Sequence, residues 1–575
     1  TGLNEYAKNY KAIYPIAARC GVFAKTDIQP LINEGATKAD LAASIFQAVV
    51  NQTISGLACG KPIRGHVAFL GGPLHFLPQL KAAFIRTLKL TDETTIDPEN
   101  SHLFAATGAA IDETPAEAQP LSALIKRLDS GVQMDFELKR LPALFEDEAD
   151  LEAFRTRHHT AVVPRGDLAT YNGDCFLGFD AGSTTTKLAL VGEKGELLYS
   201  FYANNQGNPI KTAMQAVHTL REALPAGAHI ARSCSTGYGE TLLKSAFSLD
   251  EGEVETIAHC TAASFFDPKV DCVLDIGGQD MKAIFVDHGV LSRMEINEAC
   301  SSGCGSFIET FANSLGYAVA DFAAQACLAE RPCDLGTRCT VFMNSKVKQV
   351  LREGATVADI AAGLSYSVVK NCLYKVLKLK KREELGDRIV VQGGTMRNDS
   401  VVRALELLTG AEVSRSDMPE LMGAYGCALY ARTAAKKKPA ASLDSLLASA
   451  SHTSRRLTCG GCENHCFITK YTFAGNHTYY SGNKCEKVFS NRGTGAAKGR
   501  NVSAEKNALL FDRPCPAGPR GRIGIPRVLN MYEDYPFWHA LLSEAGFEVV
   551  LSSPSTYRSY EAGVHSVMSD NICFP

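Results

Sequence analysis

The stretch FLGFDAGSTTTK (Phe176–Lys187) decides the fold of this 575-residue chain. An alternating apolar run ends in Asp180, small residues form a turn, and KLALV then returns as a second strand. The segment LDIGGQDMKAIFV (Leu274–Val286) follows the same plan, with Asp275 at the end of its first strand. Each hairpin therefore places a carboxylate and free backbone N–H groups at a strand end, which is what a phosphate and its Mg²⁺ require. The sequence predicts that two such hairpins face each other across a phosphate chain.

A third glycine-containing segment, VVQGGTMRN (Val390–Asn398), combines a buried strand with the start of a predicted helix. Gly393 and Gly394 permit close backbone approach, and we predict that they contact a nucleoside. A single Gly-Gly after a strand is usually only a turn, but three such segments in this order favour a nucleotide site. Neither the G-x-x-x-x-G-K-[ST] loop nor the G-x-G-x-x-G turn occurs, which argues against P-loop and Rossmann sites.

Composition bounds the function. The apolar fraction of 45% is typical of a packed protein, and a net charge of −3 provides no field for nucleic-acid binding. No uninterrupted apolar run approaches the roughly 20 residues that a membrane span requires, and no signal peptide is recognisable. We therefore expect a cytoplasmic protein without nucleic-acid or membrane partners. Because the sequence begins without Met, we also expect a fragment of a longer protein.

Two parts of the chain resemble each other. CGVFAKTDIQPLINEGATKADLAASI (Cys20–Ile45) aligns at a constant offset with CTVFMNSKVKQVLREGATVADIAAGL (Cys339–Leu364). The similarity continues from His66–Phe84 to Arg388–Glu406. A match of this length indicates an internal duplication. The first copy contains only the second half of the unit, and the second copy is complete.

The duplication divides the chain into five predicted segments. They are the second half of a first repeat (1–111), a connector (112–172), a complete second repeat (173–433), a linker rich in Ala, Ser and Lys (434–456), and the start of a Cys-rich α/β domain (457–575). Within the last segment, RIGIPRVL and FEVVLSS are predicted to be parallel strands on either side of a helix, and we expect Trp538 in the core.

Nineteen cysteines are many for a reducing compartment, where clustered thiols are more often metal ligands than disulfides. Four of them follow the pattern C-x₂-C-x₃-C with one further thiol: Cys459, Cys462, Cys466 and Cys485. By count, four thiolates suit Zn²⁺ and a [4Fe–4S] cluster equally. Others lie in apolar surroundings and are expected in the core: Cys59, Cys175, Cys234, Cys260, Cys272, Cys327, Cys372 and Cys427.

The ordered motifs resemble those of the ASKHA superfamily, which includes acetate and sugar kinases, Hsp70 and actin. More narrowly, GFDAGSTTTK, STGYG, DIGGQDMK, NEACSSGCGSF and CTVF resemble the BadF/BadG/BcrA/BcrD ATPases. That family includes activators of 2-hydroxyacyl-CoA dehydratases and the ATP-driven subunits of benzoyl-CoA reductase. The resemblance implies an α/β, ribonuclease H-like ASKHA fold in tandem and an ATPase of the CoA-enzyme activase type.

The resemblance also implies roles for individual residues. Asp180 and Asp275 would hold Mg²⁺ and the hydrolytic water, and Gln279 would position that water. The adenosine of ATP would lie against Gly393 and Gly394. The phosphates would be bound by the two hairpin loops, through Gly182, Ser183, Thr184, Thr185, Lys187, Gly277 and Gly278.

In that family, each subunit of a homodimer supplies two cysteines to one [4Fe–4S] cluster, and Cys300 and Cys339 match these two ligands. A helix-like segment follows each of them, and the positive N-terminal end of a helix favours an anionic cluster. In a tandem protein the two repeats would form an intramolecular pseudo-dimer, with Cys20 as the counterpart of Cys339. Because Cys304 replaces a usual Thr, either Cys300 or Cys304 could be the ligand.

The implied function is ATP-driven delivery of a low-potential electron. A ferredoxin or flavodoxin-type donor would supply the electron, and a 2-hydroxyacyl-CoA dehydratase-like or related reductase would accept it. Because this chemistry is redox chemistry, we favour a cluster over zinc at Cys459–Cys485. Two alternatives remain: a small-molecule kinase of the same superfold, which has no use for Cys300 and Cys339, and a zinc-bearing regulatory ATPase.

Overall fold

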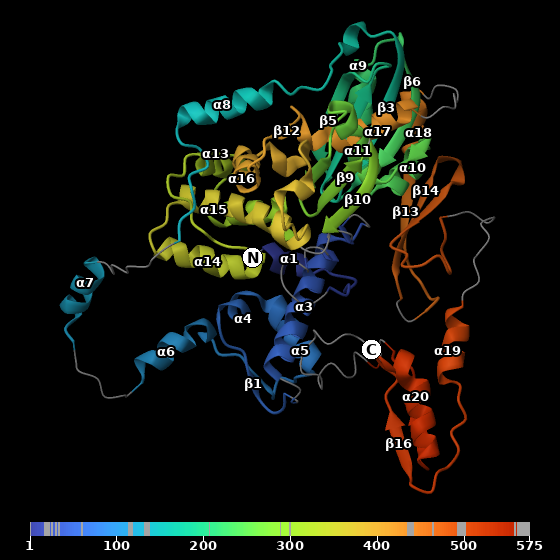
Figure 1. Ribbon diagram of the computed structural model, residues 1–575. Coiled ribbons are helices and arrows are strands. Elements are labelled where there is room, and N and C mark those ends of the chain that lie inside the picture. Colours follow the sequence, from blue (N-terminus) through green and yellow to red (C-terminus); the bar gives the residue numbers. More distant parts are fainter. Residues whose placement is uncertain are drawn as a thin grey trace.

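Figure 1 shows the computed structural model, in which residues 173–433 hold two central β-sheets and smaller units lie around them. The structure describes residues 2–16, 24, 27–28, 31–32, 35–58, 61, 63–112, 119–130, 139–205, 207–287, 289–297, 301–433, 442–462, 465–491, 502–556 and 559.

The first central sheet has the strand order β5-β4-β3-β6-β7. β3, β4 and β5 form an antiparallel meander, and β6 and β7 continue the sheet in parallel with β3. The strands are β3 (Gly173–Ala181), β4 (Thr185–Val191), β5 (Leu197–Asn204), β6 (Ala228–Thr236) and β7 (Glu251–Gly252). The predicted meander is confirmed.

The second central sheet repeats this topology as β10-β9-β8-β11-β12, with an antiparallel meander followed by two parallel strands. Its strands are β8 (Cys272–Ile276), β9 (Met281–Asp287), β10 (Val290–Asn297), β11 (Ile389–Gln392) and β12 (Val413–Arg415). Every residue of β8 and β11 is buried, as expected for strands covered on both faces. Two sheets of this order, each with its helices, confirm the predicted α/β, ribonuclease H-like fold class.

Two helices join the sheets, α11 (Glu255–Phe266) and α17 (Met422–Thr433), which pack against each other and bring α17 onto β3. Glycines permit this close packing. A Cβ on Gly178 of β3 would lie 2.2 Å from the Ala424 carbonyl oxygen, and a Cβ on Gly426 would lie 1.8 Å from the Ala258 carbonyl oxygen. This close packing of α11 and α17 keeps the ends of β3 and β8 near each other.

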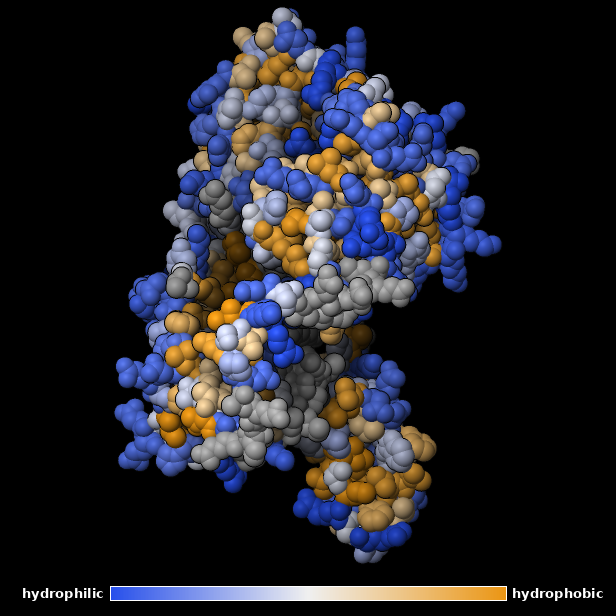
Figure 2. Space-filling view, turned by 90° about the vertical axis from the view of Figure 1, so that its left-hand side faces the viewer, coloured by the Kyte–Doolittle hydropathy of each residue, from blue (hydrophilic) through white to orange (hydrophobic). Residues whose placement is uncertain are grey.

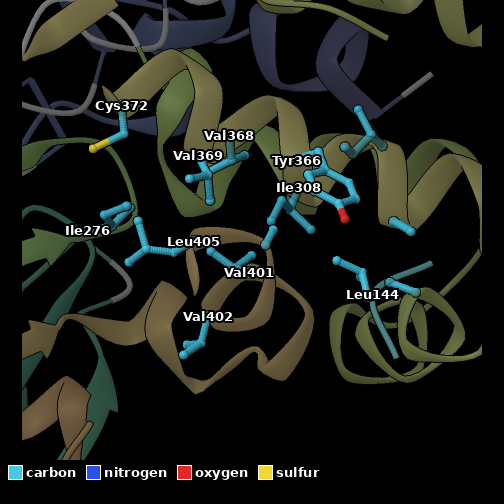
Figure 3. Close-up of a cluster of buried hydrophobic side chains, with 14 of the residues drawn as sticks. Leu144, Ile276, Ile308, Tyr366, Val368, Val369, Cys372, Val401, Val402 and Leu405 are labelled. Atoms are coloured by element: carbon cyan, nitrogen blue, oxygen red, sulfur yellow. The ribbon is translucent and has the colours of Figure 1, made fainter. Parts of the chain in front are cut away.

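The remaining helices of this unit cover the outer faces of the sheets. They are α9 (Pro209–Ala223), α10 (Glu240–Phe247), α12 (Gly305–Ser314), α13 (Val319–Cys327), α14 (Thr340–Arg352), α15 (Val357–Lys370) and α16 (Asp399–Thr409), with a π-helical turn at Asn371–Val376. Figure 3 shows the core beneath the second sheet, where Ile276 at the end of β8 lies near Leu405 and Val369. The cysteines expected in the core are buried, apart from Cys59, which lies outside the described residues.

The N-terminal region forms a separate small core. Its elements are α1 (Gly2–Ala7), α3 (Lys38–Ala58), β1 (Val67–Ala68), α4 (Gly72–Phe76), α5 (Pro78–Leu88), β2 (Thr95–Ile96) and α6 (Phe104–Ala110). Among the described helices, α3 alone is long and apolar enough to cross a membrane by length and composition. Its residues Phe46, Val50 and Ile54 are buried in the small core, together with Phe84 of α5.

Matching details link this region to the second repeat. Asp40 of α3 accepts a backbone N–H from Ala12 at 3.0 Å, and Asp359 of α15 accepts one from Arg331 at 3.0 Å. β1 pairs in parallel with β2, as β11 does with β12. The glycine before the next helix also has the same backbone conformation, with φ 94° and ψ 161° at Gly71 and φ 91° and ψ 157° at Gly393. These features support the interpretation of a duplication.

The connector contains α7 (Leu121–Asp129) and α8 (Glu148–His159). The first lies away from the rest of the chain in Figure 1, whereas the second packs on the second repeat. In the contact of α8, Arg157 donates to Glu406 of α16 at 2.8 Å. Leu151 and Phe154 of α8 are buried in the large core.

The prediction of a linker over 434–456 is wrong in its second half. Leu443–Ala450 forms helix α18, which packs on α9 and α10. Its three leucines, at positions i, i+3 and i+4, are buried in the core of the first sheet, although the segment as a whole is poor in large apolar residues. His452–Thr458 is then the first strand of a further sheet, β13.

The prediction of one Cys-rich α/β domain over 457–575 is also wrong, because the structure contains two units there. The first is an antiparallel sheet of β13, β14 (Phe467–Phe473) and β15 (Thr478–Ser481). Tyr471 and Phe473 of β14 join the core of the first central sheet. Arg456 of β13 pairs with Asp40 at 3.1 Å, so the sheet also contacts the N-terminal region.

The second unit has its own core around Tyr535. It consists of α19 (Ser503–Phe511), β16 (Arg522–Ile525), α20 (Met531–Glu544) and β17 (Glu548–Leu551). β16 and β17 are parallel, which confirms the predicted strand–helix–strand arrangement. The expectation for Trp538 is wrong, since it is 40% exposed. Figure 2 shows apolar residues gathered over this unit, at the lower end of the molecule.

Candidate functional site

The first hairpin of the site carries a buried ion pair. Asp180, at the end of β3, stands opposite Lys187 of β4, whose Nζ lies 2.7 Å from Asp180 Oδ2. Asp180 is 1% exposed, and its other oxygen, Oδ1, has no hydrogen-bond partner among the described residues. A buried carboxylate oxygen without a partner is costly, and it is a natural ligand for a cation or a water.

The second hairpin repeats the pairing with more charges. Asp275, at the end of β8, stands opposite Lys282 of β9, and Lys282 Nζ lies 3.8 Å from Asp275 Oδ2. The same ammonium group lies 3.2 Å from Glu255 Oε1 and also pairs with Asp280. Lys282 is therefore a buried cation shared by three carboxylates.

A histidine completes this cluster. His259 Nε2 of α11 lies 3.7 Å from Glu255 Oε1 and 3.7 Å from Asp275 Oδ2. Its Nδ1 lies 2.5 Å from Oε1 of Gln392, the last residue of β11. The ligand atoms of Glu255, His259 and Asp275 are within 4.8 Å of one another, so the three side chains could hold a divalent cation.

The charged groups of this cluster shift one another's pKa values, raising those of the bases and lowering that of Glu255. Burial alone would lower the pKa of His259, but the Asp275 and Glu255 carboxylates outweigh it and raise that pKa to about 9. Burial would likewise lower the pKa values of Lys187 and Lys282, yet the surrounding carboxylates raise both above the ordinary value for lysine. For Glu255, burial favours the neutral acid, but His259 and Lys282 lower its pKa. Without a bound cation, the acids of the site are thus neutralised by the protein's own bases.

The two hairpins are closed in the same way and face each other. The Gly182 N–H donates to the Thr185 carbonyl at 2.9 Å, and the Gly277 N–H donates to the Asp280 carbonyl at 3.0 Å. A Cβ placed on Gly278 would lie 3.7 Å from Thr184 Oγ1, so the tip of one hairpin reaches the other. The structure therefore brings the two predicted phosphate loops together.

Gln279 occupies the second loop. Its side-chain Nε2 is buried and has no hydrogen-bond partner among the described residues. An amide N–H₂ in that position can donate to a bound water or phosphate oxygen. Its predicted role in positioning a water remains a prediction.

Gly393 lies directly behind Asp275. A Cβ there would lie 2.3 Å from the Ile276 carbonyl oxygen and 2.7 Å from Asp275 Oδ1, and the backbone has a φ of +91°. At Gly394 the nearest atom to a Cβ would be 4.0 Å away, on Glu420, so that position is open. Gly393 thus packs closely against Asp275, whereas Gly394 leaves open space next to it.

We expect Gly393→Ala to lower the free energy of unfolding by about 2–5 kcal/mol, because it combines a positive φ with a collision against backbone. Gly410→Ala is the matched control. Its φ of +66° imposes a similar backbone strain, but nothing lies within 4 Å of its Cβ position. Denaturant unfolding should show a clearly larger loss for Gly393→Ala; equal losses would mean that the close contact with Ile276 is unimportant.

The second hairpin loop is hydrogen-bonded to the segment that follows Cys300. The N–H groups of Gly305 and Ser306, at the start of α12, donate to the carbonyls of Gly277 and Gly278 at 3.0 and 2.8 Å. Thr395 Oγ1 donates to the Gly277 carbonyl at 2.9 Å. Two main-chain hydrogen bonds therefore join the loop to the first turn of α12.

The predicted cluster ligands are only partly described. Cys339 is the N-cap residue of α14 and is half-buried, whereas Cys20 and Cys300 lie outside the described residues. Cys304 is fully buried in the large hydrophobic core, where an inorganic cluster would have no space. This burial favours Cys300 over Cys304 as a ligand.

One helical stretch joins the two thiol-bearing loops. Asn371 Nδ2 donates to the Ser302 carbonyl at 2.9 Å, and Lys375 Nζ donates to the Thr337 carbonyl at 2.5 Å. Asn371 and Lys375 are four residues apart and both belong to the π-helical turn after α15. The loop after Cys300 and the loop before Cys339 are therefore anchored to residues about one turn apart on the same helical stretch. The remaining predicted ligands, Cys459, Cys462, Cys466 and Cys485, line a single separate cavity.

Sequence reasoning missed Glu255, His259, Lys282 and Gln392. Lys282 alone had a recognisable signal, since it aligns with Lys187 when the two hairpins are superposed by sequence. Glu255 and His259 are four residues apart on a helix, a spacing that places them on one face, but nothing local relates them to Asp275.

Comparison with known proteins agrees with this geometry. Residues 177–431 match the BadF/BadG/BcrA/BcrD ATPase family, and residues 522–575 match the CoA enzyme activase uncharacterised domain. The (R)-2-hydroxyglutaryl-CoA dehydratase activating ATPase of Acidaminococcus fermentans is 33% identical over 267 residues, which are 45% of this chain and 98% of that protein. The 2-hydroxyisocaproyl-CoA dehydratase activator of Clostridioides difficile is 31% identical over 264 residues, or 45% of this chain and 96% of that protein.

A solved structure is similar as well. The crystal structure of the Acidaminococcus fermentans (R)-2-hydroxyglutaryl-CoA dehydratase component A covers 45% of this chain and 98% of its own, with 30% identity and a TM-score of 0.41. The family match and the similarity to the activating ATPase of Acidaminococcus fermentans show an ATPase of the enzyme-activase class. The chain belongs to the BadF/BadG/BcrA/BcrD ATPase family.

Proposed function

We propose that this chain hydrolyses ATP to drive a low-potential electron onto a 2-hydroxyacyl-CoA dehydratase-like or related reductase. The observation that carries the proposal is the similarity to dehydratase activators along nearly their whole length, on a segment with a buried acid at the end of each hairpin. A ferredoxin or flavodoxin-type protein is the proposed electron donor, and the cytoplasm is the proposed compartment.

In the proposed ATP site, the hairpin loops from Gly182 to Lys187 and at Gly277–Gly278 bind phosphates, and Gly393–Gly394 border the adenosine. Mg²⁺ suits this site because Asp180 Oδ1 lacks a partner among the described residues and the ligand atoms of Glu255, His259 and Asp275 converge on one point. When bound, the cation would neutralise phosphate charge. Asp275 accepts a hydrogen bond from the attacking water and then takes its proton, and Gln279 Nε2, which has no partner among the described residues, orients the water.

The proposed [4Fe–4S] site uses Cys339, which is half-buried at the N-terminus of a 13-residue helix, and Cys300. The arrangement fits an anionic group, since the helix end is positive and the two thiol-bearing loops are held one turn apart. Such a cluster would supply one-electron redox chemistry. Its third ligand in this chain would be Cys20, across an intramolecular pseudo-dimer; the Asp40 and Asp359 equivalence supports this arrangement.

Two other functions are less well supported. A small-molecule kinase of the same superfold leaves the half-buried Cys339 at a helix N-terminus without a role. A zinc-bearing regulatory ATPase accounts for the separate cysteine cavity but not for the similarity to dehydratase activators. Anaerobic purification separates the three: iron with sulfide favours the activator, a metal-free protein that phosphorylates a sugar favours the kinase, and stoichiometric zinc without iron favours the regulatory ATPase.

Cys339→Ser is expected to lower the iron and acid-labile sulfide content of the anaerobically purified protein and to abolish ATP-dependent electron transfer from a reduced flavodoxin to a redox dye. ATP affinity should stay within about twofold, because Cys339 is outside the hairpins that bind the phosphates. Cys515→Ser, which removes an exposed thiol elsewhere, is the control. Unchanged iron in Cys339→Ser would refute the ligand assignment.

A further inference from the structure

The four cysteines of the C-terminal sheet come together at one end of it. Cys459 follows β13 and Cys466 precedes β14, and the Cys459 N–H donates to the Cys466 carbonyl at 2.8 Å across the hairpin. β15 runs antiparallel to β14, so the chain beyond Ser481 returns to the same end and brings Cys485 there. The β13–β14 loop and the segment after β15 thus meet at one end of the sheet.

The cysteines line a cavity of about 50 Å³. Its other walls are apolar and basic: Ile468, Val488, Phe489, Lys484 and Lys487. Cys459 is buried, Cys466 is half-buried, and Cys462 and Cys485 are exposed. The described part of the chain contains no disulfide at these positions. Four free thiols around one cavity, two of them exposed, are typical of a metal site rather than of core packing.

The backbone around the cavity is built for thiolate ligands. The Gly461 N–H donates to Cys459 Sγ at 3.5 Å, an interaction that stabilises a negative sulfur. A Cβ on Gly461 would lie 2.4 Å from Val488 Cγ2, so the glycine lets the Val488 side chain pack close to the loop between Cys459 and Cys462. Lys487 Nζ donates to the Gly461 carbonyl at 3.2 Å and places a cation beside the site.

Zinc and a [4Fe–4S] cluster require different distances between the sulfur atoms of their four cysteine ligands. In a tetrahedral zinc site with Zn–S bonds of about 2.3 Å, the sulfur atoms are about 3.8 Å apart. Among the described residues, the four cysteines do not form a compact group of ligand atoms like that of Glu255, His259 and Asp275, whose ligand atoms all lie within 4.8 Å of one another. A [4Fe–4S] core binds each thiolate to a different iron and therefore requires wider spacing.

We propose that Cys459, Cys462, Cys466 and Cys485 bind a second iron–sulfur cluster of the [4Fe–4S] class, independent of the nucleotide site and of Cys339. The cluster closes the open end of the β13–β15 sheet, which packs on the first central sheet through Tyr471 and Phe473. It belongs to a segment that neither family match covers, since residues 177–431 and 522–575 lie on either side.

The test compares anaerobically produced wild-type chain with the Cys459→Ala/Cys466→Ala double variant. The double variant should lose about four iron and four sulfide per chain, together with the corresponding visible charge-transfer absorption. Cys515→Ala, whose thiol is exposed between α19 and β16 in the other C-terminal unit, should keep both. Equal iron in wild type and double variant, or loss of one zinc without sulfide, would overturn the proposal.

Two further variants make the result unambiguous. Cys485→Ala alters an exposed residue beyond the sheet, so it should lower iron content without disturbing the core even if the double variant fails to fold. Cys339→Ser should retain the iron of this second cluster. Failure of the quartet proposal therefore appears as unchanged iron in Cys485→Ala, whereas failure of the cluster part of the proposed function appears as unchanged iron in Cys339→Ser.

Discussion

Asp275→Asn should slow ATP hydrolysis by about 10²–10⁴-fold and leave nucleotide affinity nearly unchanged. Asn fills the same space in front of Gly393, where a Cβ would already lie 2.7 Å from Asp275 Oδ1, so packing is retained. What is lost is the negative charge that can hold a cation and accept a proton from water. The binding loops at Gly182 and Gly278 are unaffected, and the affinity for ATP should reflect them.

The rate is measured as steady-state phosphate release, and the affinity by calorimetry with a non-hydrolysable nucleotide. Asp287→Asn is a suitable control, because it alters an exposed carboxylate at the far end of β9. A hydrolysis rate within a few-fold of wild type would exclude Asp275 from catalysis. Equal losses of rate and affinity would instead make it a binding residue.

Lys282→Met should lower the free energy of unfolding of the nucleotide-free protein by about 3–5 kcal/mol. The ammonium group is 3% exposed and is shared by Glu255, Asp275 and Asp280, so its removal leaves buried carboxylates with less compensating charge. Among the described residues, His259 is the other base in direct contact with the Glu255 and Asp275 carboxylates.

Denaturant unfolding checks this result, with Lys269→Met as the control, since Lys269 is exposed on a turn and should change stability by less than about 0.5 kcal/mol. Mg²⁺ should stabilise Lys282→Met more than it stabilises the wild type, because a divalent cation can replace the missing charge. If Mg²⁺ has the same effect on both proteins, the lysine does not occupy the electrostatic position of the metal.

The hairpins could be predicted from sequence because their signal is local. Alternating apolar residues, a strand-end Asp and small turn residues all lie within Phe176–Lys187, and the structure places them as expected. The duplication could also be recognised, since it depends on matching letters. Neither inference requires knowledge of how distant segments pack.

Other features depend on packing and could not be predicted in this way. Glu255 and His259 join Asp275 only because α11 packs between the two sheets, held there by the close contact at Gly426. Composition suggested a linker where α18 forms, although three leucines on one helix face outweigh many small polar residues. The prediction that Trp538 lies in the core failed for the opposite reason, since a large aromatic side chain is buried only where another surface covers it.

The bonds from Gly305 and Ser306 to the Gly277 and Gly278 carbonyls have an implication for how this protein can diversify. Donor and acceptor are both main-chain atoms, so substitutions of the side chains do not remove these hydrogen bonds. The exception is proline at a donor position, because proline has no backbone N–H. Side chains in the neighbouring loops can therefore change during evolution without loss of this connection. The main-chain connection between the second hairpin loop and α12 is therefore retained wherever the fold is retained.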